Sequence, residues 1–357
     1  MSTFGMRAQG APKRRLAAIA LIAVLALSAC ASGSTTAGQA VDAVAAGQAE
    51  SGAFPVTVKH ALGEVTITEE PERIAVIGWT TPDIVVALGR VPVAVGKNSY
   101  GADDAGYFPW FREGVQELGG QLPLALPSLE RGEIDFEKLL DTAPDLILAT
   151  YSGITAEDYT RLSAIAPTVA YPETAWATPL EDNIKIVGKA LGVPERSKKL
   201  QASLNATISS AAQDHPEFKD VTFAYGTIPS DDGTVLFNGP ADTRVQLLEQ
   251  LGMVLAPGIS ELAAASRESS SFNVSLEDMS DLTPGVFVTN VEDGAQWKKA
   301  LASSSIFASW GPIDRGAVVV TSDHAQTMSL VSPSPLSIPW GLTSFVGPLS
   351  DAIGKLR

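Results

Sequence analysis

The sequence contains few of the residues on which disulfide-rich, metal-binding or catalytic proteins depend. Its 357 residues include one cysteine and three histidines, so no disulfide can form within the chain. Motifs of the types GxSxG, GxxxxGKS/T, HExxH and GxGxxG are absent, which removes the common signatures of hydrolases, nucleotide-binding enzymes and zinc proteases. His60, His215 and His324 are far apart in the chain, whereas a bare metal ion needs several ligands together. A surface enzyme or adhesion module and an ion receptor remain open alternatives without a supporting motif.

Basic residues are also scarce. There are 25 Lys and Arg against 40 Asp and Glu, and the formal net charge is −15. Nucleic acids are bound through basic faces that neutralise phosphates. The composition therefore argues against a nucleic-acid partner.

The single cysteine lies at the end of a short leader. Arg7, Lys13, Arg14 and Arg15 precede the 14-residue apolar run LAAIALIAVLALSA, which is short for a membrane span and typical of a signal peptide. The sequence LSAC, ending at Cys30, resembles the bacterial lipobox, in which the cysteine carries lipid and the chain is cut just before it. We therefore expect residues 1–29 to be a lipoprotein signal peptide. Its removal takes away four basic residues and no acid, so the charge moves from −15 to −19.

The remaining chain divides into a tether and a globular part. Residues 30–53 are small and polar without an aromatic side chain, which predicts a flexible tether. VTVKHALGEVTIT (56–68) predicts a β-hairpin, and after it short apolar strands such as RIAVIG (73–78) alternate with helical patterns. This alternation predicts an α/β fold with parallel sheets.

One segment interrupts the alternation. Residues 178–214 keep helical spacing of apolar residues with no strand between them, although Gly192 and Pro194 bend or break the pattern. A long helix between two α/β halves would act as a strut. We therefore predict two Rossmann-like lobes at 54–177 and 219–357, joined by one long linker helix at 178–218, with the ligand cleft between the lobes.

Three stretches resemble one family, the iron–siderophore binding proteins of ABC importers in the rigid-helix class (class III) that also includes vitamin B12 binders. They are VTVKHALGEVTITEEPERIAVIGWTTPDIVVALGRVPVAVG, FEKLLDTAPDLILATYSGITAEDYTRLSAIAPTVAY and VSLEDMSDLTPGVFVT. The resemblance covers about residues 56–355. It implies a monomeric, non-enzymatic receptor without a resident cofactor, anchored outside the cell membrane by lipid. Such a receptor would pass a ferric siderophore to an ABC permease with its ATPase; a haem or corrinoid receptor of the same fold is the alternative.

Candidate ligand-binding residues follow from the rule that open α/β sheets bind ligands at the carboxyl ends of their strands. Aromatic side chains there either cover a ligand or pack in the core. The candidates are Trp79, Tyr100, Tyr107, Trp110, Tyr151, Tyr225, Asn238 and Arg244, with Lys97, Tyr171, Asn290 and His324 at further strand ends. Arg244 is included because an arginine side chain can donate forked hydrogen bonds to the clustered oxygen atoms of a ferric siderophore. Because basic residues are sparse, a neutral or cationic hydroxamate, or a mixed chelate, is expected rather than a trianionic catecholate.

Two acids are expected to contact the permease. Glu137 and Glu277 each lie at the start of a predicted helix, in FEKLL and LEDMS. The resemblance implies that one surface glutamate per lobe, at this point of the motif, pairs with arginines of the permease.

Overall fold

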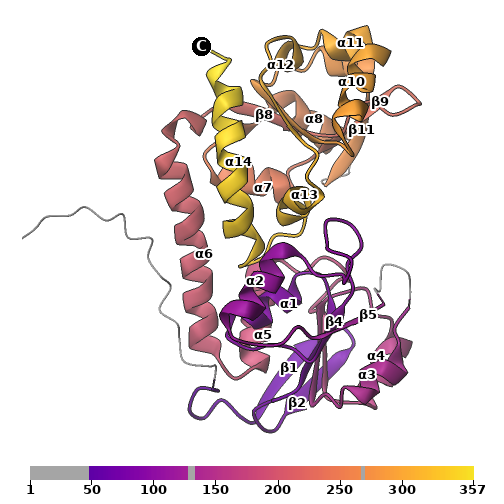
Figure 1. The fold of residues 1–357 in the computed structure, drawn as a ribbon, viewed down its shortest axis with the longest axis vertical. Helices are drawn as coiled ribbons and strands as arrows, with labels where there is room; N and C mark the ends of the chain where they lie inside the picture. The colour runs from indigo at the N-terminus through magenta and orange to yellow at the C-terminus, as the bar shows by residue number, and fades with distance from the viewer. Residues whose placement is uncertain (1–47, 128–132, 267–269) are drawn as a thin grey trace, which may run out of the picture. The chain divides into compact units, whose positions relative to one another are not determined.

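Two parallel β-sheets form the centres of two lobes (Figure 1). The computed structural model describes residues 48–127, 133–266 and 270–357. Within them, the first sheet has the strand order β5-β4-β3-β6-β7 and the second the order β10-β8-β12-β13, with parallel pairing throughout. The first sheet comprises β3 (Ile74–Gly78), β4 (Ala94–Gly96), β5 (Leu124–Leu126), β6 (Leu146–Tyr151) and β7 (Thr168–Ala170), and the second β8 (Thr222–Tyr225), β10 (Val254–Leu255), β12 (Val286–Asn290) and β13 (Val318–Thr321). The predicted two-lobed α/β class is confirmed.

Two antiparallel strand pairs lie outside these sheets. β1 (Val56–His60) pairs with β2 (Gly63–Ile67), as the alternating pattern predicts. β9 (Thr234–Asn238) pairs with β11 (Ser271–Ser275) and does not enter the parallel sheet. An isolated strand pattern therefore predicts the strand but not its partner, because register and pairing depend on contacts distant in sequence.

Helices surround both sheets, and several begin with a polar cap. Thr155 and Asp158 form a reciprocal capping box at the start of α4 (Ala156–Ser163), which satisfies backbone N–H groups that have no partner within the helix. None of the helices in the described ranges is long and apolar enough to cross a membrane. The lobe helices are α1 (Thr81–Ala87), α2 (Pro109–Glu117), α3 (Phe136–Asp141), α4 (Ala156–Ser163), α7 (Thr243–Gln250), α8 (Pro257–Ser266), α9 (Leu276–Ser280), α10 (Gly294–Ser303), α11 (Ser305–Ala308), α12 (Gly311–Asp314), α13 (His324–Val331) and α14 (Ser337–Gly354).

The span 178–218 holds two α-helices and a short 3-10 turn, η2 (Pro216–Phe218). The helix α5 (Leu180–Ala190) packs against β1 and β6 of the first lobe. Gly192, with a φ of 71°, ends it, and Pro194 begins the 21-residue helix α6 (Pro194–Asp214). At 1.5 Å per residue α6 is about 30 Å long. The contacts favour α6 as the linker and α5 as part of the N-terminal lobe.

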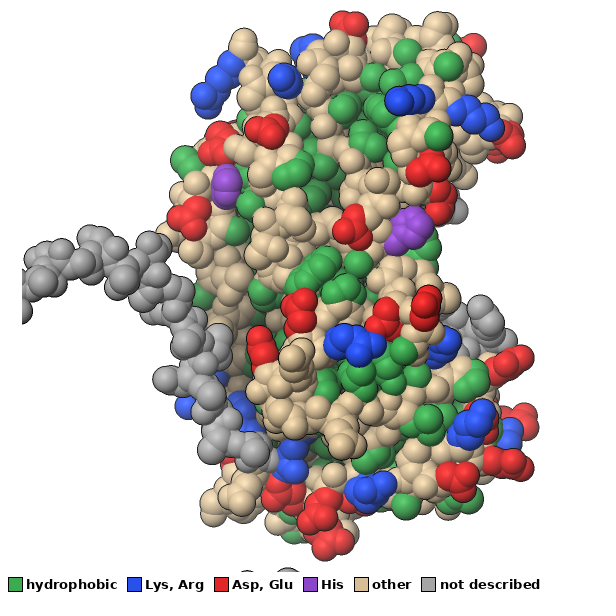
Figure 2. Space-filling view, viewed as in Figure 1, with side chains coloured by type: hydrophobic (Ala, Val, Ile, Leu, Met, Phe, Trp, Pro, Cys, Tyr) green, Lys and Arg blue, Asp and Glu red, His purple; other side chains and the backbone are tan. Residues whose placement is uncertain are grey.

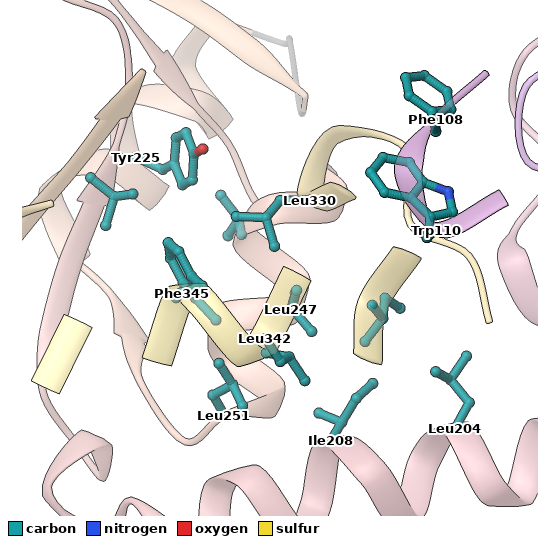
Figure 3. Close-up of a cluster of buried hydrophobic side chains, with 14 of the residues drawn as sticks. Phe108, Trp110, Leu204, Ile208, Tyr225, Leu247, Leu251, Leu330, Leu342 and Phe345 are labelled. Atoms are coloured by element: carbon teal, nitrogen blue, oxygen red, sulfur yellow. The ribbon is translucent and has the colours of Figure 1, made fainter. Parts of the chain in front are cut away.

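A continuous apolar core extends through both lobes. Figure 3 shows Leu204 and Ile208 of α6 facing side chains of α7, α13 and α14. At the same interface, the ring centres of Trp110 on α2 and Trp340 on α14 are 5.3 Å apart. The lobes therefore share buried surface in addition to the linker.

A buried carboxyl group also joins the two lobes. Asp83, in the first turn of α1, accepts hydrogen bonds from Trp110 Nε1 at 2.8 Å and from Ser334 Oγ at 2.5 Å. Ser334 lies 251 residues further along the chain, just before α14. Burial raises the pKa of Asp83 to about 7, although the two hydrogen bonds lower it. The carboxyl group is thus held between elements from opposite ends of the globular part.

Candidate functional site

The strand order defines one point in each sheet where a ligand crevice is expected. In the first sheet the chain proceeds outward from β3 on one side and from β6 on the other, and in the second sheet from β8 and β12. A crevice opens at the carboxyl ends of strands at such a reversal. Trp79 follows β3 and Tyr151 ends β6, while Tyr225 ends β8 and Asn290 ends β12. The candidate site therefore lies where these four strand ends face the space between the lobes.

Three aromatic side chains form a wall on the N-terminal lobe. The ring centres of Trp79 and Trp176 are 5.5 Å apart, and those of Tyr151 and Trp176 are 6.1 Å apart with the rings edge to face. Trp176 is 37% exposed, so a large apolar surface remains open to a ligand. Trp176 was not predicted, because it lies in the loop beyond β7 and not at a strand end.

A buried polar network positions this wall. Thr150, next to Tyr151, donates to Asn183 Oδ1 at 2.6 Å, and Asn183 Nδ2 donates to Thr80 Oγ1 at 3.1 Å. Gly78 has a φ of 123°, and a Cβ atom there would lie 2.2 Å from the carbonyl oxygen of Tyr151. Only glycine permits this close approach. The ends of β3 and β6 are therefore fixed by packing and hydrogen bonds rather than by a ligand.

On the C-terminal lobe, Arg244 forms an ion pair with Asp242. Arg244, at the start of α7, donates from Nε to Asp242 Oδ1 at 2.8 Å and from Nη2 to Asp242 Oδ2 at 2.7 Å. Asn238 Nδ2 and the backbone N–H of Arg244 also donate to the Asp242 carboxylate. Burial alone would lower the pKa of Arg244, but the hydrogen bonds and charge of Asp242 outweigh burial and raise it. Asn238 is buried and supports this pair.

Tyr225 lies beside the pair. The guanidinium carbon of Arg244 is 5.1 Å from the centre of the Tyr225 ring. Burial raises the pKa of Tyr225 to about 12, with the charge of Arg244 opposing that rise and the charge of Asp242 adding to it. Its buried hydroxyl group has no partner in hydrogen-bonding geometry among the described residues. Burial and then the charge of Asp242 also raise the pKa of Tyr151, which places that carboxylate near the aromatic wall.

A loop of the N-terminal lobe reaches the C-terminal lobe at the edge of the cleft. The ring of Tyr100 stacks on that of His324 with centres 4.3 Å apart. A Cβ atom at Gly101 would lie 2.6 Å from the carbonyl oxygen of His324, so the two backbones approach closely. His324 Nε2 is 3.1 Å from a carboxylate oxygen of Glu292. Burial and the charge of Glu292 raise the pKa of Tyr100.

Two predicted aromatic residues face the core. Tyr107 is buried, and its hydroxyl group donates to the carbonyl oxygen of Pro123. Trp110 is buried between Phe108 and Trp340 and donates to Asp83. The structure therefore does not bring these two candidates to the open aromatic wall, because the segment that enters α2 and the first turn of that helix point their aromatic side chains into the core.

The remaining predicted positions lie at the margins. Lys97 is exposed and donates from Nζ to the carbonyl oxygen of Asp104. The hydroxyl group of Tyr171 donates to the carbonyl oxygen of Ile154. Asn290 is partly buried at the end of β12. None of these side chains joins the wall or the Arg244 pair through a contact in the described residues.

The two acids predicted to contact a permease occupy equivalent helix positions. Glu137 is the second residue of α3 after the cap Asp135, and Glu277 is the second residue of α9 after the cap Ser275. Both side chains are exposed. Each cap accepts a hydrogen bond from the backbone N–H three residues later, so both glutamates extend from ordered first turns.

A cavity of about 660 Å³ lies beside α6 and is lined by residues of both lobes. Its lining includes Tyr151 of the aromatic wall, Leu204 and Ile208 of α6, and Thr243 and Leu247 of α7. Among the described residues no group of three His, Cys, Asp or Glu side chains is placed to hold a metal ion. Cys30, with the whole predicted leader, lies outside the described residues.

These features agree with a comparison to known protein families. The model of the periplasmic binding proteins matches residues 74–310. The chain belongs to this family. The match spans the first sheet, the linker helix and the second sheet up to β12, and ends before β13.

Three relatives illustrate the family. The Bacillus subtilis (strain 168) protein YhfQ, which bears the name of an ABC transporter substrate-binding lipoprotein, is 24% identical over 65% of this chain and 69% of its own length. PiaA of Streptococcus pneumoniae TIGR4, solved with ferrichrome, is 32% identical with a TM-score of 0.72 over 85% of this chain and all of PiaA. SirA of Staphylococcus aureus, solved with staphyloferrin B, is 19% identical with a TM-score of 0.63 over 82% of this chain and 97% of SirA, and supports the fold.

The family places the protein in transport. The periplasmic binding protein family and the ABC-transporter relative identify this chain as an extracytoplasmic substrate-binding protein of an ABC importer, and not an enzyme. Its fold is the two-lobed, helix-linked type seen in siderophore-binding proteins. The predicted family is thereby confirmed.

Proposed function

We propose that this binding protein is a lipid-anchored receptor that captures a ferric siderophore between its lobes and delivers it to the permease. The main support is the partly exposed aromatic wall at the strand reversal of the first sheet, which consists of Trp79, Tyr151 and Trp176. The charge of Asp242 acts on Tyr151 in this wall. Arg244, held by that same Asp242, supplies hydrogen-bond donors at the other reversal. A ferric siderophore combines a bulky apolar periphery with clustered oxygens, which matches these two surfaces.

The relative PiaA supports this proposal. It is 32% identical over all of its length and was solved with ferrichrome, a ferric hydroxamate. The iron in such a ligand is held by the chelator, so the receptor needs no metal ligands of its own. Tyr107 and Trp110 are left out of the proposed binding surface because both are buried in the core.

The test is a fluorescence titration of the purified chain. Ferric hydroxamates, ferric catecholates, haem and cobalamin are added separately while tryptophan emission is followed. We expect saturable quenching by at least one ferric siderophore, because Trp79 and Trp176 would lie against the coloured chelate. Quenching by haem or cobalamin alone would replace the proposal with the haem or corrinoid alternative, and no binding by any of the four would reject the whole set.

We propose that Cys30 carries the lipid. The support is the LSAC sequence behind a basic, apolar leader and the lipoprotein name of the Bacillus relative. Each buried CH₂ group of an acyl chain contributes about 0.8 kcal/mol to membrane binding, so two or three chains anchor stably. Cys30→Ala should remain unprocessed or leave the membrane fraction. Normal cleavage and retained acyl label in that variant would contradict the anchor.

We also propose that Glu137 and Glu277 contact the permease. They occupy the same position on corresponding helices of the two lobes and both are exposed. Two carboxylates on lobes joined by a rigid linker and a shared core present a fixed spacing to a partner. Charged groups at the rim of an interface mainly govern encounter and orientation.

The double variant Glu137→Ala with Glu277→Ala should therefore lose iron uptake in cells while ligand affinity in solution stays unchanged. Glu157→Ala is a matched control, because Glu157 is also the exposed second residue of its helix, α4. Full uptake by the double variant would exclude the docking role. A loss of ligand affinity would assign these residues to the fold or the cleft.

A further inference from the structure

The charges around the cleft do not form a positive pocket. Asp242 and Glu292 contribute negative charge near the aromatic residues, through Tyr151 and Tyr100 respectively. Arg244 supplies the positive charge of the pair that it forms with Asp242. Figure 2 shows acidic and basic side chains intermingled on both lobes, and in the described part of this face Lys and Arg do not gather into one patch.

Asp242 is the centre of the polar side of the cleft. Its two carboxylate oxygens accept four hydrogen bonds, from the side chain and backbone of Arg244 and from Asn238. The side chains of Arg244 and Asp242 are 20% and 13% exposed. Because both charges are largely withdrawn from water, solvent screens them little, and each acts on a nearby ligand more strongly than a surface charge would.

We propose that Asp242 is a specificity-determining residue that makes the cleft selective by charge, admitting neutral or cationic ferric chelates and rejecting negatively charged ones. This inference rests on the proposed siderophore function. Asp242 cancels the positive charge of Arg244, so the pair offers an anionic chelate no net attraction, and Glu292 adds negative charge at the cleft. A neutral chelate still receives directed hydrogen bonds from the guanidinium, since the pair holds Arg244 in one orientation.

The geometry explains why Asp242 acts on the ligand and not only on its own helix. Its carboxylate caps α7 by accepting from the backbone of Arg244, a role that asparagine fills equally well. Tyr151 of the opposite lobe and Thr243, the neighbour of Asp242, line the same cavity. Burial raises the pKa of Tyr151, and the charge of Asp242 adds to that rise. A cap alone would need the oxygen atom but not the negative charge.

The experiment compares three probes on the full chain. They are ferrichrome (neutral), ferrioxamine B (cationic) and a ferric tris-catecholate with three negative charges, each titrated by tryptophan quenching at low and physiological salt. The wild type should bind the neutral or cationic probe at least 100-fold more tightly than the tris-catecholate. Asp242→Asn, which keeps the cap, should reduce that ratio by about tenfold or more, and the reduction should shrink as salt screens the charges.

Two further variants complete the test. Glu292→Gln removes the second acid of the cleft, which is more exposed, and should shift the ratio in the same direction by a smaller factor. Asp351→Asn makes the same charge change in the last turn of α14 and should leave the ratio unchanged. Two results would overturn the charge selectivity proposed for Asp242 and leave the siderophore function in place. One is equal binding of all three probes by the wild type. The other is an unchanged ratio of affinities in Asp242→Asn with thermal unfolding intact. Binding of none of the probes overturns the siderophore function as well.

Discussion

The two sides of the cleft differ in how their side chains are held. On the N-terminal lobe, Trp176 and Tyr100 are 37% and 36% exposed and contact other rings. On the C-terminal lobe, Tyr225 and Asn238 are almost fully buried, and Asn238 and Arg244 are fixed to Asp242. One side offers broad apolar surface with few directional bonds, and the other a small set of directed polar groups.

This difference indicates a division of roles. Aromatic faces accept ligands of varied outline, since stacking and burial are weakly directional. A preorganised guanidinium discriminates by position and charge, because its hydrogen bonds have a fixed geometry. The N-terminal side would therefore contribute affinity for many chelates, and the C-terminal side would select among them. Four predictions test this comparison, beginning with the contact that holds the two sides together.

The largest effect is expected on stability, at Asp83. Its pKa is about 7 in the folded protein against 3.8 for an ordinary aspartate, so between these pH values the folded state binds the proton more tightly than the unfolded state. Stability from this group is therefore greatest below about pH 4 and falls until about pH 7. A shift of about three units corresponds to about 4 kcal/mol.

The measurement is chemical denaturation of wild type and Asp83→Asn between pH 4 and pH 8. The wild type should lose stability relative to the variant as pH rises, by a few kcal/mol. Asp351→Asn, at an exposed position, should follow the wild-type curve. A constant difference between wild type and Asp83→Asn would contradict the buried, protonated link to Trp110 and Ser334.

The next largest effect is expected on ligand affinity, at Arg244 on the C-terminal side of the cleft. Arg244→Ala should weaken siderophore binding by about 1.5–3 kcal/mol, the usual scale for a hydrogen bond to a charged group. Arg244→Lys should recover only part of that loss, because an ammonium cannot form the fork. Both are measured by titration with ferrichrome, with thermal unfolding as the control. Equal affinity in wild type and Arg244→Ala would assign the C-terminal side no role in binding.

A smaller loss is expected on the aromatic side. Trp79→Ala and Trp176→Ala should each weaken binding by about 1 kcal/mol, less than the cost of removing a fully buried aromatic side chain, because the wall is partly exposed. Each should also reduce the fluorescence quench. Trp297→Phe removes a tryptophan that packs on Phe307 in the C-terminal lobe and should keep both affinity and the relative quench. Equal losses of fluorescence quenching in all three variants would show that Trp79 and Trp176 are no closer to the ligand than Trp297, and would contradict a binding role for the wall.

The smallest effect is expected in shape. The linker helix and the shared core resist hinge bending, so small-angle scattering with and without ligand should give near-identical radii of gyration. A clear compaction on binding would mean that the two sides of the cleft meet only in the complex. In that case their division of roles could not be inferred from the free protein.

Most of the fold could be predicted because its signals are local. Alternating strands and helices, the opening hairpin and the long helical segment each appear in neighbouring residues. The partner of β9 and the break between α5 and α6 depend on contacts and a backbone turn that the apolar pattern does not determine. The strand-end rule predicts that Trp79, Tyr151 and Tyr225 lie at strand ends, and the sheet topology, which the sequence does not give, places those ends at the reversals.

The site was less predictable because side-chain direction is not local. The aromatic loop before α2 suggested binding residues, yet Tyr107 and Trp110 face inward. Trp176 was missed because a lone tryptophan in a polar loop has no periodic signal; its place six residues beyond β7 was the available clue. Asp242 looks like an ordinary helix cap, and only the structure reveals its contact with Arg244 and its influence on Tyr151.

The contact between Asp83 and Ser334 also bears on the order in which the chain can fold. The two residues are separated by 251 positions, and the core of the first lobe includes Trp110 packed on Trp340 of the final helix. Contacts this distant in sequence form late and slow folding. A nascent chain that has reached residue 330 can build both sheets but cannot close the surface between them. Completion of this fold therefore awaits the last few dozen residues, so a chain truncated there would keep its sheets and leave apolar surface open where the lobes should join.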